Sequence, residues 1–167
     1  SLDIPCGIKN DMKGDIEVAT QGCMMVKQNH TFLNINNYGN IEKVDSKGNN
    51  NSCIILRGSI INGPNYHQEY IVKCEELCNK YNISKSIIID CSHGNSNRYF
   101  KNQLNVIKSI IEQKKNGNNS VRGFMVESFI NEGKQSISNT LQYGISITDC
   151  CLGWIDTEKC LDLLNSI

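Results

Sequence analysis

Short runs of apolar residues alternate along the chain with longer stretches in which apolar residues recur every three or four positions. The short runs are rich in β-branched residues and bounded by turn-forming residues, which predicts strands. Five strands are predicted: Ile4–Lys9, Thr31–Ile35, Ser52–Gly58, Ser86–Ser92 and Val121–Ser128. Runs such as Ile87-Ile88-Ile89 are continuous rather than alternating. Continuous runs are typical of strands that are buried on both faces of a parallel sheet.

The longer stretches predict amphipathic helices, because their apolar residues fall on one face at helical spacing. The inward faces comprise Ile71, Cys74, Leu77, Cys78 and Tyr81 in one helix, Phe100, Leu104, Ile107 and Ile111 in the next, and Cys160, Leu161 and Leu164 in a helix over Thr157–Ile167. In addition, the polar run Asn36–Asn40 separates two short apolar runs. We therefore expect a β-hairpin over Thr31–Val44.

Strands and helices that alternate about every 30 residues indicate βαβ units and an α/β fold with a parallel sheet. Four predicted strands end in a residue capable of chemistry, namely Lys9, Arg57, His93 and Glu127. Active sites of (β/α)8 TIM barrels are built at this carboxyl end of the strands. A complete barrel takes roughly 250 residues, whereas this chain has 167. We expect half of a barrel, with the hairpin inserted.

Composition narrows the function classes. The chain carries 17 basic and 17 acidic residues, so no strongly basic face is expected for nucleic acid or an anionic membrane. No apolar run approaches the roughly 20 residues of a membrane-spanning helix. The first residues, Ser1-Leu2-Asp3, contain no initiator Met. We expect the chain to be a piece of a longer protein.

The nine cysteines predict free thiols rather than a disulfide framework. Their number is odd, no Cys-x-x-Cys motif occurs, and most lie within apolar runs or on helix faces. Free cysteine behaves as a small hydrophobic residue, and reduced thiols are usual inside cells. The expected location is cytoplasmic.

A candidate metal site is formed by His93, Glu127 and Asp149, which follow separate elements. One imidazole and two carboxylates suit a divalent ion such as Mn²⁺, Fe²⁺ or Zn²⁺. The alternative is a structural histidine that is hydrogen-bonded within the fold.

Lys9 and Arg57 are candidate receptors for an anion, because a guanidinium matches phosphate and an ammonium reaches carboxylate or phosphate. The alternative for Arg57 is a structural salt bridge. The chain has only two other arginines, Arg98 and Arg122, which are expected on the surface.

An ordered series of motifs runs through almost the whole chain. The motifs are Ile4-Pro5-Cys6-Gly7-Ile8-Lys9-Asn10, Ile54-Ile55-Leu56-Arg57-Gly58, Pro64-Asn65-Tyr66, Asp90-Cys91-Ser92-His93-Gly94-Asn95-Ser96, Met125-Val126-Glu127-Ser128, Glu132-Gly133, Tyr143-Gly144-Ile145-Ser146-Ile147-Thr148-Asp149 and Leu152-Gly153-Trp154. The series resembles the carboxyl-terminal half of the type I 3-deoxy-D-arabino-heptulosonate 7-phosphate (DAHP) synthases. Residues 1–167 would then form the carboxyl-terminal half of a single barrel domain.

The resemblance implies an enzyme that condenses phosphoenolpyruvate with erythrose 4-phosphate at the start of the shikimate pathway. In this family a Cys, a His, a Glu and an Asp hold a divalent ion (Mn, Fe, Co or Zn), and the last three match His93, Glu127 and Asp149. Lys9 and Arg57 match residues that bind phosphoenolpyruvate. The resemblance thus makes Lys9 and His93 catalytic, and Lys9, Arg57 and Asp149 substrate-binding.

None of the nine cysteines matches the family's metal-binding Cys, so we expect the isolated chain to be inactive. One alternative is a non-catalytic half-barrel, either a remnant or one piece of a split enzyme. Another is the related synthase that uses arabinose 5-phosphate. The resemblance also implies a homo-oligomer for the full-length protein and an aromatic amino acid as a possible effector.

Overall fold

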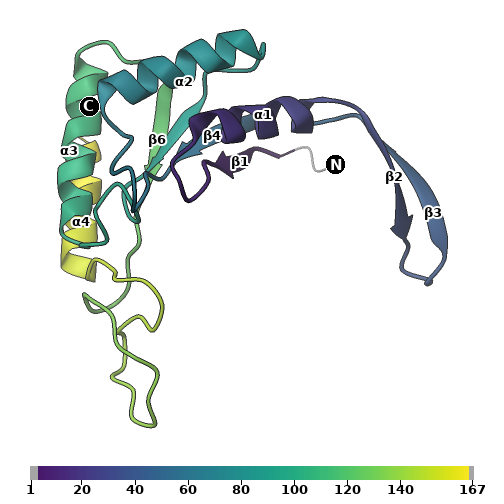
Figure 1. Cartoon of the computed structure of the whole chain (residues 1–167). Coiled ribbons are helices and arrows are strands. Elements are labelled where there is room, and N and C mark those ends of the chain that lie inside the picture. The colour runs from purple at the N-terminus through teal and green to yellow at the C-terminus, as the bar shows by residue number, and fades with distance from the viewer. Residues whose placement is uncertain (1–3, 166–167) are drawn as a thin grey trace.

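A computed structural model of the chain, described here for residues 4–165, contains a four-stranded parallel sheet, a separate two-stranded hairpin and four helices (Figure 1). The elements follow in the order β1 (Cys6–Lys9), α1 (Ile16–Lys27), β2 (His30–Ile35), β3 (Ile41–Ser46), β4 (Ser52–Leu56), α2 (Gln68–Lys80), β5 (Ile87–Asp90), α3 (Asn102–Lys115), β6 (Val121–Met125) and α4 (Trp154–Leu164). The predicted α/β class with a parallel sheet is confirmed.

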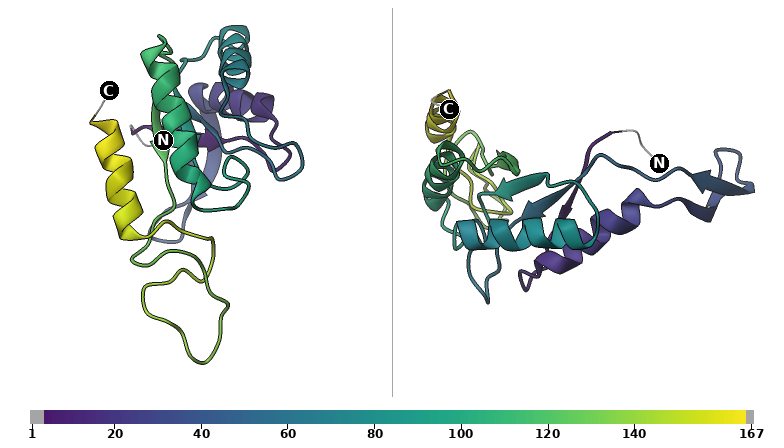
Figure 2. Two further views of the ribbon diagram at one scale, coloured as in Figure 1. Left: turned by 90° about the vertical axis from the view of Figure 1, so that its left-hand side faces the viewer. Right: turned by 90° about the horizontal axis from the view of Figure 1, so that it is seen from above.

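The sheet has the strand order β1-β4-β5-β6, so that each strand pairs with the next strand of the sheet along the chain. The central strands β4 and β5 are almost wholly buried, as their continuous apolar runs predicted. Helices α1, α2 and α3 lie along one side of the sheet (Figures 1 and 2). Fully buried side chains between these layers include Leu56, Ile71, Ile89 and Ile107. This core fixes the ends of the four strands relative to one another.

The hairpin formed by β2 and β3 lies between α1 and β4 in sequence and projects away from the sheet (Figure 1). Its strands pair antiparallel, from His30 opposite Ser46 to Ile35 opposite Ile41. Every residue of β2 is exposed. In the turn, the Asn36 side-chain oxygen accepts hydrogen bonds from the backbone N–H groups of Tyr38 and Asn40. The hairpin is therefore held together by local contacts.

Helix α4 differs from the prediction in the face that it buries. Leu161 and Leu164, predicted to point inward, are 52% and 37% exposed. Cys160 is buried as predicted, whereas Thr157 is buried and Leu163 packs against the core in place of the two leucines. These three residues recur every three positions and form a stripe too narrow to include the two exposed leucines. Residues 166 and 167 of the predicted range lie outside the described part of the chain.

All nine cysteines are free thiols, and six of them are buried. Burial raises the pKa of the Cys23 thiol to about 11, so that this group stays protonated at neutral pH. Buried thiols such as Cys23 therefore act as apolar packing groups. Within residues 4–165, no helix has the length and apolar character needed to span a membrane.

Candidate metal centre

The predicted site residues gather at the carboxyl end of the sheet. Lys9 is the last residue of β1, and Arg57 directly follows β4. His93 lies three residues beyond the end of β5, and Glu127 lies two residues beyond the end of β6. Asp149 belongs to the long irregular segment between β6 and α4. The fold thus brings together all five residues that the sequence singled out.

His93, Glu127 and Asp149 form a compact cluster in which one potential ligand atom of each residue lies within 4.8 Å of the others. The Nε2 atom of His93 is 3.5 Å from Glu127 Oε1 and 3.9 Å from Asp149 Oδ2. His93 and Glu127 are partly buried, whereas the Asp149 side chain is 60% exposed. The cluster is therefore open to solvent on the side of Asp149.

Glu127 is held in place through its backbone and its carboxylate. The fully buried Gln103 of α3 accepts a hydrogen bond from the Glu127 N–H and donates one to the Glu127 carbonyl. Ser92 donates a hydrogen bond of 2.9 Å to Glu127 Oε2. The second oxygen, Oε1, remains directed at His93. Gln103 and Ser92 thus fix which carboxylate oxygen faces the imidazole.

Asp149 is positioned by the closure of the long segment between β6 and α4. The buried Leu152 donates its N–H to the Glu127 carbonyl, and its carbonyl accepts the N–H of Phe129. Gly133 and Cys151 exchange a further pair of backbone hydrogen bonds. The end of the segment therefore lies beside its beginning. As a result, Asp149 lies next to Glu127 although 22 positions separate them in the sequence.

A buried carboxylate that the sequence analysis did not select lies behind His93. Asp90 Oδ2 is 2.7 Å from Lys9 Nζ and 3.0 Å from His93 Nδ1. Asp90 is the last residue of β5 and sits in the same motif as His93. Its position at the carboxyl end of a strand, like that of Lys9, was the available signal.

Three buried asparagines connect the loops that follow β1, β4 and β5. Asn10 accepts the N–H of Arg57, and Asn65 accepts the N–H of Gly58. Asn95 accepts the N–H of Asn65 and donates to the carbonyls of Leu56 and Asp90. Because buried polar groups require partners, this network fixes the loop backbones that carry Arg57 and His93. The sequence analysis did not select these asparagines, because most of their partners are backbone groups.

Two glycines allow the loops after β4 and β5 to touch. Gly58 has φ +68°, and a Cβ there would lie 2.6 Å from the backbone N of Asn95. A Cβ at Gly94 would lie 2.2 Å from the backbone N of Ser59. Real Cβ atoms do not approach backbone so closely. Only glycine at both positions permits this contact, which places Arg57 beside His93.

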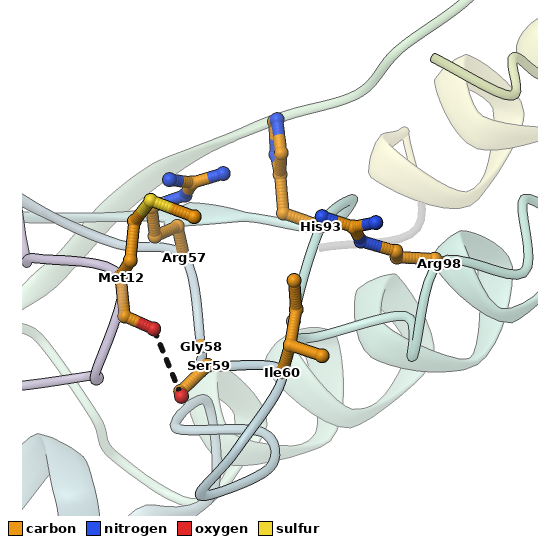
Figure 3. Close-up of a pocket in the computed structure, with 8 residues that line it drawn as sticks. Met12, Arg57, Gly58, Ser59, Ile60, His93 and Arg98 are labelled. Atoms are coloured by element: carbon orange, nitrogen blue, oxygen red, sulfur yellow. Dashed lines mark hydrogen bonds between the residues drawn. The ribbon is translucent and has the colours of Figure 1, made fainter.

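Arg57, His93 and Arg98 line a pocket at this contact (Figure 3). In the view of Figure 3 the two guanidinium groups lie on either side of His93. The Nε atom of Arg57 is buried and has no hydrogen-bond partner in the described part of the chain. Within residues 4–165, neither arginine forms a salt bridge, which excludes the structural ion pair as the role of Arg57 there. The pocket volume is about 10 Å³, so an anion would lie over it rather than inside it.

The donor set fits a divalent metal ion. One imidazole nitrogen and two carboxylate oxygens converge, which is the ligand number that catalytic metal sites in proteins commonly supply. Three carboxylates surround His93, and Lys9 is their one cationic partner in a described ion pair. A bound cation would compensate the remaining negative charge. The fold and the site therefore define an α/β protein with a candidate metal centre beside a pocket lined by two arginines, at the carboxyl end of a parallel sheet.

Comparisons with known proteins agree with this class. The sequence model of the DAHP synthetase I family matches residues 1–162. The tyrosine-inhibited phospho-2-dehydro-3-deoxyheptonate aldolase of Schizosaccharomyces pombe is 40% identical over 97% of this chain and 45% of its own length. The phenylalanine-inhibited enzyme of Saccharomyces cerevisiae is 41% identical over 98% of this chain and 46% of its own length.

A solved phospho-2-dehydro-3-deoxyheptonate aldolase from Francisella tularensis superposes with a TM-score of 0.90 at 36% identity, over 96% of this chain and 47% of that structure. The chain therefore belongs to the DAHP synthetase I family. It spans about half the length of these relatives.

Proposed function

We propose that this chain is the carboxyl-terminal half of a 3-deoxy-7-phosphoheptulonate synthase, which joins phosphoenolpyruvate to erythrose 4-phosphate. The observation that carries the proposal is the convergence of His93, Glu127 and Asp149 beside Arg57, whose Nε atom has no hydrogen-bond partner among residues 4–165. This pairing of a metal cluster with an anion receptor suits a reaction between an aldehyde and a phosphorylated enol acid. Family membership supports the same activity.

In the proposed reaction, the methylene carbon of phosphoenolpyruvate attacks the aldehyde carbon of erythrose 4-phosphate. Water then adds to the phosphate-bearing carbon, and inorganic phosphate leaves. Arg57 would bind the phosphate with charge-assisted hydrogen bonds, and Lys9 would bind the carboxylate. Arg98, on the other side of the pocket, adds a second guanidinium for the same anion. These cations would orient the enol toward the aldehyde.

His93, Glu127 and Asp149 would hold the divalent ion. When bound, the ion would supply Lewis acidity to the aldehyde oxygen. Ser92 and Gln103 keep Glu127 in position for this role.

We further propose that residues 1–167 form one half of a single (β/α)8 barrel, with the hairpin of β2 and β3 as an insertion. The edge strands β1 and β6 each pair on one side only within the described sheet. Unpaired strand edges are avoided in native proteins, and a closed barrel removes them. The preceding half of the relatives would supply the partner strands and the remaining metal ligand. The chain alone would therefore lack synthase activity.

The test is reconstitution of the barrel. The chain would be fused to the amino-terminal half of the Saccharomyces cerevisiae relative, and heptulosonate phosphate formation would be measured with and without a chelator. We expect chelator-sensitive product from the fusion and none from the chain alone. A folded fusion that binds metal but forms no product would favour the non-catalytic alternative.

Arg57→Ala in the fusion tests the anion receptor. A hydrogen bond to a charged group contributes about 1.5–3 kcal/mol, so the phosphoenolpyruvate requirement should rise by roughly one to two decades while metal content stays unchanged. Arg122→Ala is the matched control, because Arg122 is exposed on β6. Loss of metal in Arg57→Ala with normal phosphoenolpyruvate binding would contradict this assignment.

A second candidate site lies at the base of the hairpin, where a cavity of about 550 Å³ is lined by Met25, Val26, His30 and Phe32, among others. Relatives are named as tyrosine-inhibited or phenylalanine-inhibited. We propose that this cavity binds an aromatic amino acid effector. Thermal shifts with phenylalanine, tyrosine and tryptophan, compared between the wild-type fusion and Phe32→Ala, would test this. Equal shifts in both proteins would contradict it.

A further inference from the structure

Asp90 occupies a position between the metal cluster and the anion receptor. Its side chain is only 3% exposed, and the single oxygen Oδ2 contacts both Lys9 Nζ at 2.7 Å and His93 Nδ1 at 3.0 Å. The other oxygen, Oδ1, accepts the backbone N–H of Ser92 at 3.0 Å. Both oxygens are therefore committed, which fixes the orientation of the carboxylate.

A carboxylate this deeply buried needs a compensating partner. Lys9 supplies the positive charge, and its ammonium group lies closer to Asp90 Oδ2 than the His93 imidazole does. Asp90 in turn restrains the long Lys9 side chain at the end of β1. The carboxyl group thus links the residue proposed to bind substrate with the residue proposed to bind metal.

The contact with His93 bears on which imidazole nitrogen carries the proton. A neutral imidazole has one N–H and one free lone pair, and a hydrogen bond at one nitrogen decides the state of the other. Asp90 lies 3.0 Å from Nδ1, whereas Glu127 and Asp149 lie 3.5 and 3.9 Å from Nε2. Among the described residues Nδ1 is buried and has no hydrogen-bond partner, so the Asp90 contact acts on it through charge, and the nearer carboxylate favours a proton on Nδ1. The Nε2 lone pair then faces Glu127 and Asp149.

We propose that Asp90 is a positioning residue that holds the His93 imidazole with Nδ1 protonated and Nε2 free to bind metal, while it anchors Lys9 through the same oxygen. The metal-binding part of this inference rests on the proposed function. The tautomer part does not, because it concerns the chain without any ion. Carboxylates that orient metal-binding histidines in this way change metal affinity by about 10–100-fold when they are replaced.

Asp90→Asn tests the proposal with almost no change in shape. An amide has only one acceptor oxygen, and the Ser92 N–H requires it. The amide NH2 group would then face Lys9 and His93, and it would donate to Nδ1 rather than accept from it. The tautomer should therefore reverse.

The first readout is the long-range ¹H–¹⁵N correlation of the imidazole ring in the metal-free chain at about pH 8, where an ordinary histidine is neutral. The chain has only three histidines, and His93→Gln would assign the signal. We expect the Nδ1–H tautomer in the wild type and the Nε2–H tautomer in Asp90→Asn. A wild-type His93 in the Nε2–H form would overturn the proposal, and this measurement holds even if the variant does not fold.

The second readout is Co²⁺ affinity, which should fall about 10–100-fold in Asp90→Asn. Asp156→Asn is the matched control, because Asp156 forms an ion pair with Lys159 on α4, away from the site. If Asp90→Asn kept both the wild-type tautomer of His93 and the wild-type affinity for Co²⁺, the inference would be overturned. A wild-type chain that shows the Nδ1–H tautomer but binds no Co²⁺ would instead refute the proposed metal site and leave the tautomer assignment standing.

Discussion

Asparagine side chains organise two very different parts of this molecule, the loops at the carboxyl end of the sheet and the turn of the hairpin. Asn95 is buried, and its amide joins the loops that follow β4 and β5. Asn36 is only half-buried, and its side chain bonds within the hairpin, to the backbone N–H groups of Tyr38 and Asn40 and to the Glu42 carboxylate. Both side chains use the same amide groups. If the side chain is removed, however, water can reach the groups left without a partner only at the hairpin. The contrast therefore teaches that burial decides how much each contact contributes.

The largest difference in stability between the sheet and the hairpin is expected when a large apolar side chain is truncated to alanine in each. Leu56→Ala removes a fully buried side chain of β4, whereas Leu33→Ala removes one that is 75% exposed on β2. We expect Leu56→Ala to lower the free energy of unfolding by about 2–5 kcal/mol and Leu33→Ala to change it by no more than about 0.5 kcal/mol. Urea denaturation of both variants checks this. If both variants lost a similar free energy of unfolding, Leu33 would have to be packed against other residues, in contradiction to its exposure in this structure.

The next largest loss of stability is expected where the loops after β4 and β5 touch. Gly58→Ala would place a Cβ against the Asn95 backbone, whereas Gly39→Ala in the hairpin turn would meet nothing within 4 Å. Both residues have a positive φ, so both variants carry similar backbone strain and only Gly58→Ala adds a clash of about 1–3 kcal/mol. The difference in thermal denaturation midpoint measures the clash. Equal midpoints would mean that the loops are not in close contact.

A smaller effect should come from the asparagines themselves. Asn95→Ala leaves buried backbone groups without partners, at about 1–3 kcal/mol for an unsatisfied group, whereas Asn36→Ala exposes its partners to water. Urea denaturation should show the larger loss for Asn95→Ala. If Asn36→Ala were equally destabilising, burial would not explain the contrast.

The smallest effect is expected at the surface between α1 and α2. Hydrogen bonds from Lys80 and Tyr81 hold the pKa of Glu17 below its usual value. A lowered pKa in the folded state adds stability above the unfolded pKa and loses it as pH falls through the folded pKa. The wild type should therefore exceed Glu17→Gln slightly in thermal midpoint near neutral pH, and the gap should close in acid. A gap that persists unchanged in strong acid would contradict the ion pair as its cause.

The sequence predicted the sheet and the convergence of the candidate site residues better than it predicted the side chains that hold these residues in place. The continuous apolar runs of β4 and β5 directly reflect burial on both faces, and residues at strand ends meet because the strands are parallel. Leu161 was misplaced because apolar character alone does not show how narrow the contact of α4 is. Gln103 and Asn95 escaped notice because their buried partners are backbone groups, which leave no mark in the residue pattern.

Metal binding by His93, Glu127 and Asp149 is the property on which the proposed function depends most directly. Equilibrium dialysis of the chain against Co²⁺ would compare the wild type with Glu127→Gln and with Glu132→Gln, an exposed carboxylate that pairs with Lys101. We predict that the wild type and Glu132→Gln bind one ion per chain and that Glu127→Gln loses it, because a neutral amide is a poor replacement for a carboxylate ligand. Binding that is absent from the wild type, or equal in all three proteins, would contradict the account.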